Sequence, residues 1–269
     1  MKFRVYAVVG ATLSGIGFLH ANLSTAQDNA PIDLSGVWSA NSFDTLENPG
    51  WDIVGLFSCR CALETYDYLN SLLNDRANDN MNAVEIIEAL EEHTREIIAN
   101  RLTDRGRADW DAFDLADDPA IQCEPFPSFR TSLHSDPIVF ETYADHILIK
   151  GEDLTVDRTV YIDGRGHPEN LEPSPAGHSI GWYEDGAFVV ETVGVIPSLV
   201  DDQLTLLSSD QAHSVERYWL SNDGRQLQTQ FTIHDPVMLK APLTIHRPRV
   251  LTPDVELDRA PCEAIAGQF

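Results

Sequence analysis

The sequence predicts a mainly β fold, an antiparallel barrel of about eight or nine strands with a helical insert after the first strand. Between residues 138 and 250, short segments of alternating apolar and polar residues are separated by turn sequences such as Glu184-Asp185-Gly186 and Asn222-Asp223-Gly224. This alternation has the two-residue period of strands, and no helical period interrupts it. Closing such a meander into a barrel removes the exposed edges that invite aggregation.

The helical insert is predicted over residues 62–115, behind a first strand near 33–39 that is entered through Gly36. Apolar residues recur at steps of three and four from Leu63 to Leu73, which indicates one helix. Asn82 followed by Glu85 is typical of a capping box at the start of a second helix. Thr103 is the expected N-cap of a third, shorter one. We expect these helices to cover one side or end of the β core.

Eight further strands are expected, at residues 138–143, 146–150, 155–162, 178–183, 187–193, 214–220, 226–234 and 243–250. The alternation is clearest in 226–234, where Leu227 and Phe231 share one face while Gln228 and His234 share the other. One face is therefore buried, and the other faces water or a cavity.

Residues 1–26 have the features of a secretory signal peptide: Lys2 and Arg4, an apolar run that ends at Leu19, and the small-residue exit Ser24-Thr25-Ala26. The apolar run is too short and too rich in glycine for a membrane span. We predict cleavage near Ala26, one domain over 27–269 with no membrane insertion, and a periplasmic or secreted location.

The formal net charge of −25 argues against nucleic acid and anionic lipid surfaces as partners, because like charges repel. An excess of carboxylates also keeps an exported protein soluble, and this simpler explanation needs no cationic ligand.

Four cysteines lie beyond the leader: Cys59, Cys61, Cys123 and Cys262. An even number in an oxidising compartment favours disulfides, and three pairings are open. Because a bond between Cys59 and Cys61 would close a strained ring, we expect these two to pair with Cys123 and Cys262. A metal site is the alternative, but no second close Cys or His pair supports it, so no metal is predicted.

The tripeptide Gly36-Val37-Trp38 resembles the Gly-x-Trp of the first lipocalin strand. The resemblance implies a lipocalin-like barrel in which Trp38 packs across one end against an arginine from near the last strand. Arg247 and Arg249 are the counterparts here. The long helical insert departs from the lipocalin pattern and leaves the strand order open.

A second resemblance covers residues 121 to 263. Residues 161–168, 177–184, 188–192 and 215–218 have the sequences YIDGRGHP, GHSIGWYE, FVVET and VERY, and they resemble a large group of exported bacterial proteins of unassigned function. The resemblance implies a β-rich fold and an exported location, and no activity.

The candidate catalytic residues are His178, His167, Asp163 and Glu191, with a tyrosine as hydrogen-bond donor to an oxyanion, from Tyr161 or Tyr218. Imidazole gives and takes protons near neutral pH, and a carboxylate can orient it. Each residue also has a structural interpretation. Asp163 suits a turn, and Arg165 can pair with a nearby carboxylate such as Glu169.

Stronger catalytic signatures are absent from the sequence. Gly177-His178-Ser179-Ile180-Gly181 matches the letters of the nucleophile elbow but opens a strand, whereas the elbow requires a strand-to-helix turn. No phosphate-binding or dinucleotide glycine loop is present either, so no cofactor is predicted.

Three functional hypotheses follow. The first is a barrel that holds a small, mostly apolar molecule in a cavity lined by Tyr161, Trp182, Phe188, Tyr218 and Phe231. The second is a cofactor-free isomerase, cyclase, lyase or hydratase in the same cavity. The third is a structural or partner-binding protein whose helical insert forms the contact surface. Convergence of the histidines and carboxylates favours the second, and a filled barrel beside exposed apolar helix residues favours the third.

Overall fold

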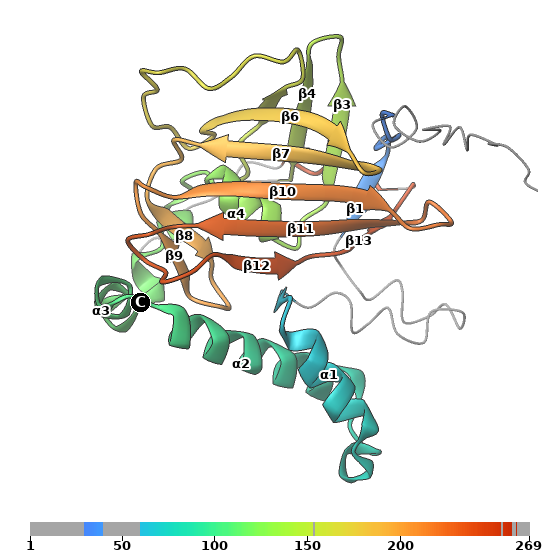
Figure 1. Ribbon diagram of the computed structural model, residues 1–269, viewed down its shortest axis with the longest axis vertical. Helices are drawn as coiled ribbons and strands as arrows, with labels where there is room; N and C mark the ends of the chain where they lie inside the picture. Colours follow the sequence, from blue (N-terminus) through green and yellow to red (C-terminus); the bar gives the residue numbers. More distant parts are fainter. Residues whose placement is uncertain (1–29, 40–59, 153, 254, 260–261, 263–269) are drawn as a thin grey trace, which may run out of the picture.

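The computed structural model describes residues 30–39, 60–152, 154–253, 255–259 and 262. Nine of its strands close into a barrel, because β10 pairs with both β7 and β11 while β1 pairs with both β3 and β13 (Figure 1). The nine strands are β1 (Val37–Ser39), β3 (Ile138–Thr142), β4 (His146–Gly151), β5 (Arg158–Tyr161), β6 (His178–Glu184), β7 (Ala187–Val193), β10 (His213–Leu220), β11 (Gln226–His234) and β13 (Arg249–Leu251).

The predicted barrel with a helical insert is confirmed, but its sheet is mixed. Strands β5 and β6 run parallel, with Val160 opposite Ser179 and Tyr161 opposite Ile180. A tight hairpin can join only antiparallel strands, whereas a long connection lets the chain return to the end from which the previous strand began. Residues 162–177 provide that connection here.

The predicted last strand is split in two. Its first part, β12 (Leu243–His246), pairs with β11 and with β2 (Cys61–Ala62) outside the ring, and β13 completes the ring. The break falls at Arg247-Pro248, where proline has no backbone N–H to donate to a sheet. A separate pair, β8 (Ser198–Asp201) and β9 (Leu206–Ser208), was not predicted.

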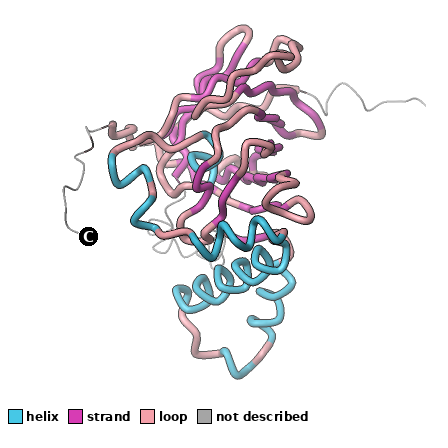
Figure 2. The backbone as a smooth tube through the Cα atoms, turned by 90° about the vertical axis from the view of Figure 1, so that its left-hand side faces the viewer, coloured by secondary structure: helices cyan, strands magenta, loops and turns pink. Residues whose placement is uncertain are grey.

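The helical insert contains α1 (Thr65–Asn74), the 3₁₀ turn η3 (Arg76–Asn78), α2 (Ala83–Arg101) and α3 (Asp104–Ala112). The predicted capping box is present: Asn82 Oδ1 accepts from the N–H of Val84 at 2.9 Å, and Glu85 Oε2 accepts from the N–H of Asn82 at 2.8 Å. Thr103 caps α3 as predicted. Figures 1 and 2 show that α1 and α2 form a hairpin that projects away from the barrel.

A short helix that the sequence did not reveal, α4 (Ser128–Leu133), follows two 3₁₀ turns, η4 (Leu115–Asp117) and η5 (Pro119–Gln122). All six residues of α4 are buried although four of them are polar, so the helix has no solvent-exposed face and its sequence no amphipathic period. Its Phe129 packs edge-on against Phe231 of β11, with ring centroids 5.8 Å apart. We call α4 the plug helix, because it fills the barrel from within.

One disulfide joins Cys123 to Cys262, so the predicted pairing of these two with Cys59 and Cys61 is wrong. The C-terminal segment runs beside the strands that follow Cys123, where Arg259 forms an ion pair with Asp157 at 2.6 Å. Cys61 is disulfide-bonded too, whereas Cys59 and the predicted signal peptide lie outside the described residues. Among the described residues, no helix is long and apolar enough to span a membrane.

The lipocalin resemblance singled out Trp38, Arg247 and Arg249, and all three are buried. Trp38 pairs with Leu251 across β1 and β13, so Arg249 lies on the same face as the tryptophan, two positions away. The Arg249 guanidinium donates to the carbonyl oxygens of Asp136 and His134, at 2.6 and 2.8 Å. Arg249 therefore ties the last strand to the end of the plug helix.

Candidate functional site

The barrel interior holds a buried polar network centred on Glu216 of β10. Arg158 Nη2 and Ser132 Oγ each donate to Glu216 Oε2 at 2.9 Å, and the Tyr218 hydroxyl donates to the same oxygen. All four side chains are buried. Burial opposes ionisation of Glu216, but the Arg158 cation and the hydrogen bonds from Arg158, Tyr218 and Ser132 together outweigh it and lower the pKa of the carboxyl.

This network leaves the predicted ligand-lining residues in two different environments. Phe188, Tyr218 and Phe231 face the interior with at most 1% of their surface exposed, so they are packed against other side chains. Trp182 and Tyr161 lie on the outer face, where Trp182 donates to Glu184 Oε2 at 2.9 Å. The five residues therefore do not line one cavity.

Three of the four predicted catalytic residues meet on the outer face of the barrel. His178 begins β6 and Glu191 lies near the end of β7, and both face outward because their neighbours Ser179 and Thr192 face inward. His167, from the 162–177 connection, has its Nδ1 atom 2.8 Å from Nδ1 of His178, and its Nε2 atom is 3.6 Å from Glu191 Oε2. We call His167, His178 and Glu191 the histidine cluster.

The local backbone brings His178 into this position. Gly177 directly before it has φ of +64°, and a Cβ atom there would lie 2.7 Å from the carbonyl oxygen of Val193. Only glycine fits this close approach to the neighbouring strand at little cost.

Tyr161 and Asp163 flank the cluster on one side. The ring of Tyr161 stacks on His178 with centroids 5.3 Å apart, and the Arg165 guanidinium lies 4.0 Å over the tyrosine ring. Asp163 binds Arg165 through two oxygens, and this hydrogen bonding lowers the pKa of Asp163 to about 2. Asp163 thus pairs with Arg165 and is not a member of the contact chain from His178 to Glu191.

Two histidines that the sequence analysis did not select flank the cluster on the other side. His213 and His234 occupy directly paired positions on β10 and β11, and their rings stack with centroids 4.6 Å apart. Burial and His213 together lower the pKa of His234, while the negative charge of Glu191 acts in the opposite direction. The hairpin turn at 222–224 fixes this register, so the pairing could have been derived from the sequence.

The electrostatics suit His178 to accept a proton. Partial burial, then the nearby His167, then Arg165 lower its pKa below the usual value of 6.5. The imidazole is therefore neutral at neutral pH and carries a free lone pair. Within the described residues, His167 Nε2 has no hydrogen-bond partner, although it faces Glu191.

No group of three or more His, Cys, Asp or Glu side chains among the described residues is arranged to hold a metal ion. The two Nδ1 atoms of the histidine cluster contact each other directly, so the pair is organised to share a proton.

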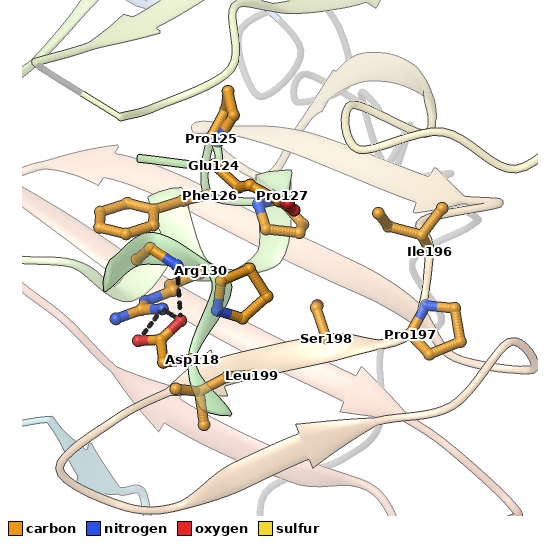
Figure 3. Close-up of a pocket in the computed structure, with 12 residues that line it drawn as sticks. Asp118, Glu124, Pro125, Phe126, Pro127, Arg130, Ile196, Pro197, Ser198 and Leu199 are labelled. Carbon is orange, nitrogen blue, oxygen red and sulfur yellow. Dashed lines mark hydrogen bonds and ion pairs between the residues drawn. The ribbon is translucent and has the colours of Figure 1, made fainter. Parts of the chain in front are cut away.

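A small pocket lies at one end of the barrel, between the plug helix and β8 (Figure 3). Its volume is about 80 Å³. Arg130 and Asp118 form a buried ion pair at 2.8 Å beside it, and the Arg130 guanidinium lies 4.2 Å from the centroid of the Phe126 ring. The remaining walls are mostly apolar and include Pro119, Pro125, Pro127, Ile196, Pro197 and Leu199. We call this the mouth pocket.

No protein-family model and no curated protein matches this chain.

Proposed function

We propose that the protein binds a small molecule at the histidine cluster and moves a proton on it, as a cofactor-free isomerase, lyase or hydratase does. The observation that carries the proposal is the contact chain from His178 through His167 to Glu191. Acid–base catalysis uses this arrangement, in which a second group orients the base and a carboxylate faces that second group.

The carboxylate of Glu191 favours a proton on Nε2 of His167, because opposite charge stabilises the N–H that faces it. Nδ1 of His167 then accepts a hydrogen bond from Nδ1–H of His178. This leaves Nε2 of His178 as the proton acceptor. In an isomerisation, His178 takes a proton from one substrate atom and returns it to another, so atoms and charge balance without an added reagent.

The experiment measures double-bond migration in cyclohex-3-enone, a simple ketone whose isomerisation requires one proton to be removed and one returned. We expect the wild-type protein to accelerate the reaction and His178→Gln to lose about 100-fold or more, the usual contribution of a general base. Glu191→Gln should lose less, because it only orients His167.

His93→Gln is the matched control, since His93 lies on α2 and outside the cluster. A wild-type rate equal to that of His178→Gln would contradict the proposal. A loss in His93→Gln as large as that in His178→Gln would contradict it as well.

A second candidate function is the binding of a small, mostly apolar molecule in the mouth pocket. The apolar walls and the buried Arg130–Asp118 pair favour it, because binding sites combine apolar surface with a few fixed polar groups. The deep interior of the barrel is less suited, since the aromatic side chains there are inaccessible.

Native mass spectrometry of protein purified from its own host tests this second candidate. Ala120→Trp would fill the mouth pocket, and Ala116→Trp adds the same bulk on η4, away from the pocket lining. A bound mass present in the wild type and in Ala116→Trp but lost in Ala120→Trp is the expected result. A mass retained in all three proteins would place the ligand elsewhere.

We also infer that the protein is exported, to the periplasm or beyond. The Cys123–Cys262 disulfide supports this, because such bonds persist in oxidising compartments. Fractionation of the host, followed by N-terminal sequencing of the mature protein, tests both the location and the expected cleavage near Ala26.

A further inference from the structure

The tip of the α1–α2 hairpin presents apolar surface far from the histidine cluster. Leu73 at the end of α1 is 52% exposed, and Val84 at the start of α2 is 60% exposed. Figures 1 and 2 show the tip as the part of the described chain that projects farthest from the barrel. Exposed apolar side chains that gather on one surface mark interaction sites.

The same tip is hollowed. A pocket of about 180 Å³ opens between α1, η3 and α2, and its apolar lining residues are Leu72, Leu73, Met81 and Ile86. Asp75 and Asp79 stand on its rim, together with Asn78. Asn78 Nδ2 donates to the carbonyl of Leu72 at 3.1 Å, so the turn that shapes the pocket is held by its own hydrogen bonds.

The negative charge of the hairpin indicates which kind of partner can bind at its tip. Residues 64–96 contain nine carboxylates and two arginines, and Arg76 at the tip already faces Asp79 at 3.7 Å. A second copy of this chain carries the same negative charge, as do nucleic acid and anionic lipid, so all three are repelled. A basic segment is attracted.

We propose that the hairpin tip docks a basic segment of another protein, which places an apolar side chain in the pocket between Leu73 and Met81 and lysine or arginine residues against the acidic rim. The apolar side chain supplies affinity, and the flanking charges supply orientation and the association rate. This surface is separate from the proposed catalytic site.

Fluorescence anisotropy with the labelled peptide Lys-Leu-Leu-Lys-Lys-Leu-Leu-Lys tests the proposal on the whole protein. The comparison peptides replace every leucine by serine or every lysine by glutamate. We expect the parent peptide to bind, both comparison peptides to bind at least about tenfold more weakly, and the affinity to fall between about 0.1 M and about 1 M salt.

The variant with Leu73→Ser and Val84→Ser should weaken the parent peptide about tenfold or more. Both side chains are exposed, so the variant is expected to fold. Leu115→Ser is the matched control, because Leu115 is also 52% exposed but lies on η4. Asp79→Asn should weaken binding and reduce its salt dependence, whereas Asp111→Asn on α3 should not.

Several outcomes would overturn the proposal. They are no binding of the parent peptide, equal binding of the serine-substituted peptide, equal loss in Leu115→Ser, and a dimer of this chain that Leu73→Ser dissociates. Binding to phosphatidylglycerol vesicles in place of the peptide would also overturn it, because it would identify a membrane surface as the occupant.

Discussion

At the centre of the barrel, the carboxylate of Glu216 accepts hydrogen bonds from three side chains, which come from the plug helix, β5 and β10. Every member is buried, so each depends on the others to replace the water it has lost. The network fixes the position of the plug helix against the strands.

Replacing Glu216 by glutamine should destabilise the protein by about 3–5 kcal/mol, because the Arg158 cation would be left buried without a counter-charge. The free energy of unfolding from urea titration measures this. Glu141→Gln is the control, since the Glu141–Lys150 pair lies on the surface, where solvent screens the charges, and its loss should cost far less. Equal losses of unfolding free energy in the two variants would show that the buried Glu216–Arg158 pair stabilises the protein no more than a surface pair.

The pH dependence of stability has a definite sign at the same residue. The pKa of Glu216 is lower in the folded state, so its contribution is present above the unfolded pKa and is lost as the pH falls through the folded value. We expect wild-type stability to decline on acidification more steeply than that of Glu216→Gln. Urea titrations across the acid range test this, and parallel curves would contradict it.

His178 gives a prediction that needs no substrate. Arg165 helps to lower the pKa of His178, so Arg165→Met should raise that pKa. An NMR titration of the imidazole signals measures the change. Arg105→Met on α3 serves as the control, because Arg105 pairs with Asp109 instead. An unchanged His178 pKa in Arg165→Met would show that Arg165 does not influence the protonation of His178.

At the scale of the elements, the position of α3 depends on one close approach between its backbone and the 235–240 turn. A Cβ atom on Gly106 would lie 2.2 Å from the carbonyl oxygen of Met238, so the helix contacts the 235–240 turn through bare backbone. Thr103 adds to this contact, since its N–H donates to the same carbonyl at 3.0 Å.

Gly106→Ala should therefore destabilise the protein by about 1–3 kcal/mol, although alanine is the better helix former. Gly166→Ala is the control, because nothing lies within 4 Å of the added methyl group. Thermal unfolding compares the two. If Gly106→Ala raises the melting temperature, the contact between α3 and the turn is looser than described.

The polarity pattern of each segment determined whether its helix or strand could be predicted from the sequence. Alternation located β11 to the residue, and the capping residues located the starts of α2 and α3. The plug helix had no such signal, because a helix buried on every side has no periodic contrast. The parallel β5–β6 pair was missed because strand order is a long-range property.

The candidate site was predictable to a similar extent. His167, His178 and Glu191 were selected by residue type and do come together. Phe188, Tyr218 and Phe231 were assigned to a cavity because alternation identifies an inward face but not whether that face is open or packed. The inward face is packed because the plug helix fills the barrel, and the sequence did not reveal this helix.

At the scale of the whole molecule, the Cys123–Cys262 bond closes a loop across a sequence separation of 139. Replacing both cysteines by serine should lower the free energy of unfolding by about 2–5 kcal/mol, since the unfolded chain regains freedom. Urea titration measures the loss. Because Cys61 keeps its own bond, the variant isolates this disulfide. An unchanged free energy would mean that the C-terminal segment is held by its other contacts.

The seam of the barrel also dictates when the protein can finish folding. Strand β1 pairs with β13, and residues 38 and 251 are opposite each other there. The ring thus stays open until almost the whole polypeptide has emerged, and contacts so distant along the chain form slowly. The edge of β1 that faces β13 therefore stays unpaired until residues 249–251 are available, and an unpaired strand edge of this kind can join another strand.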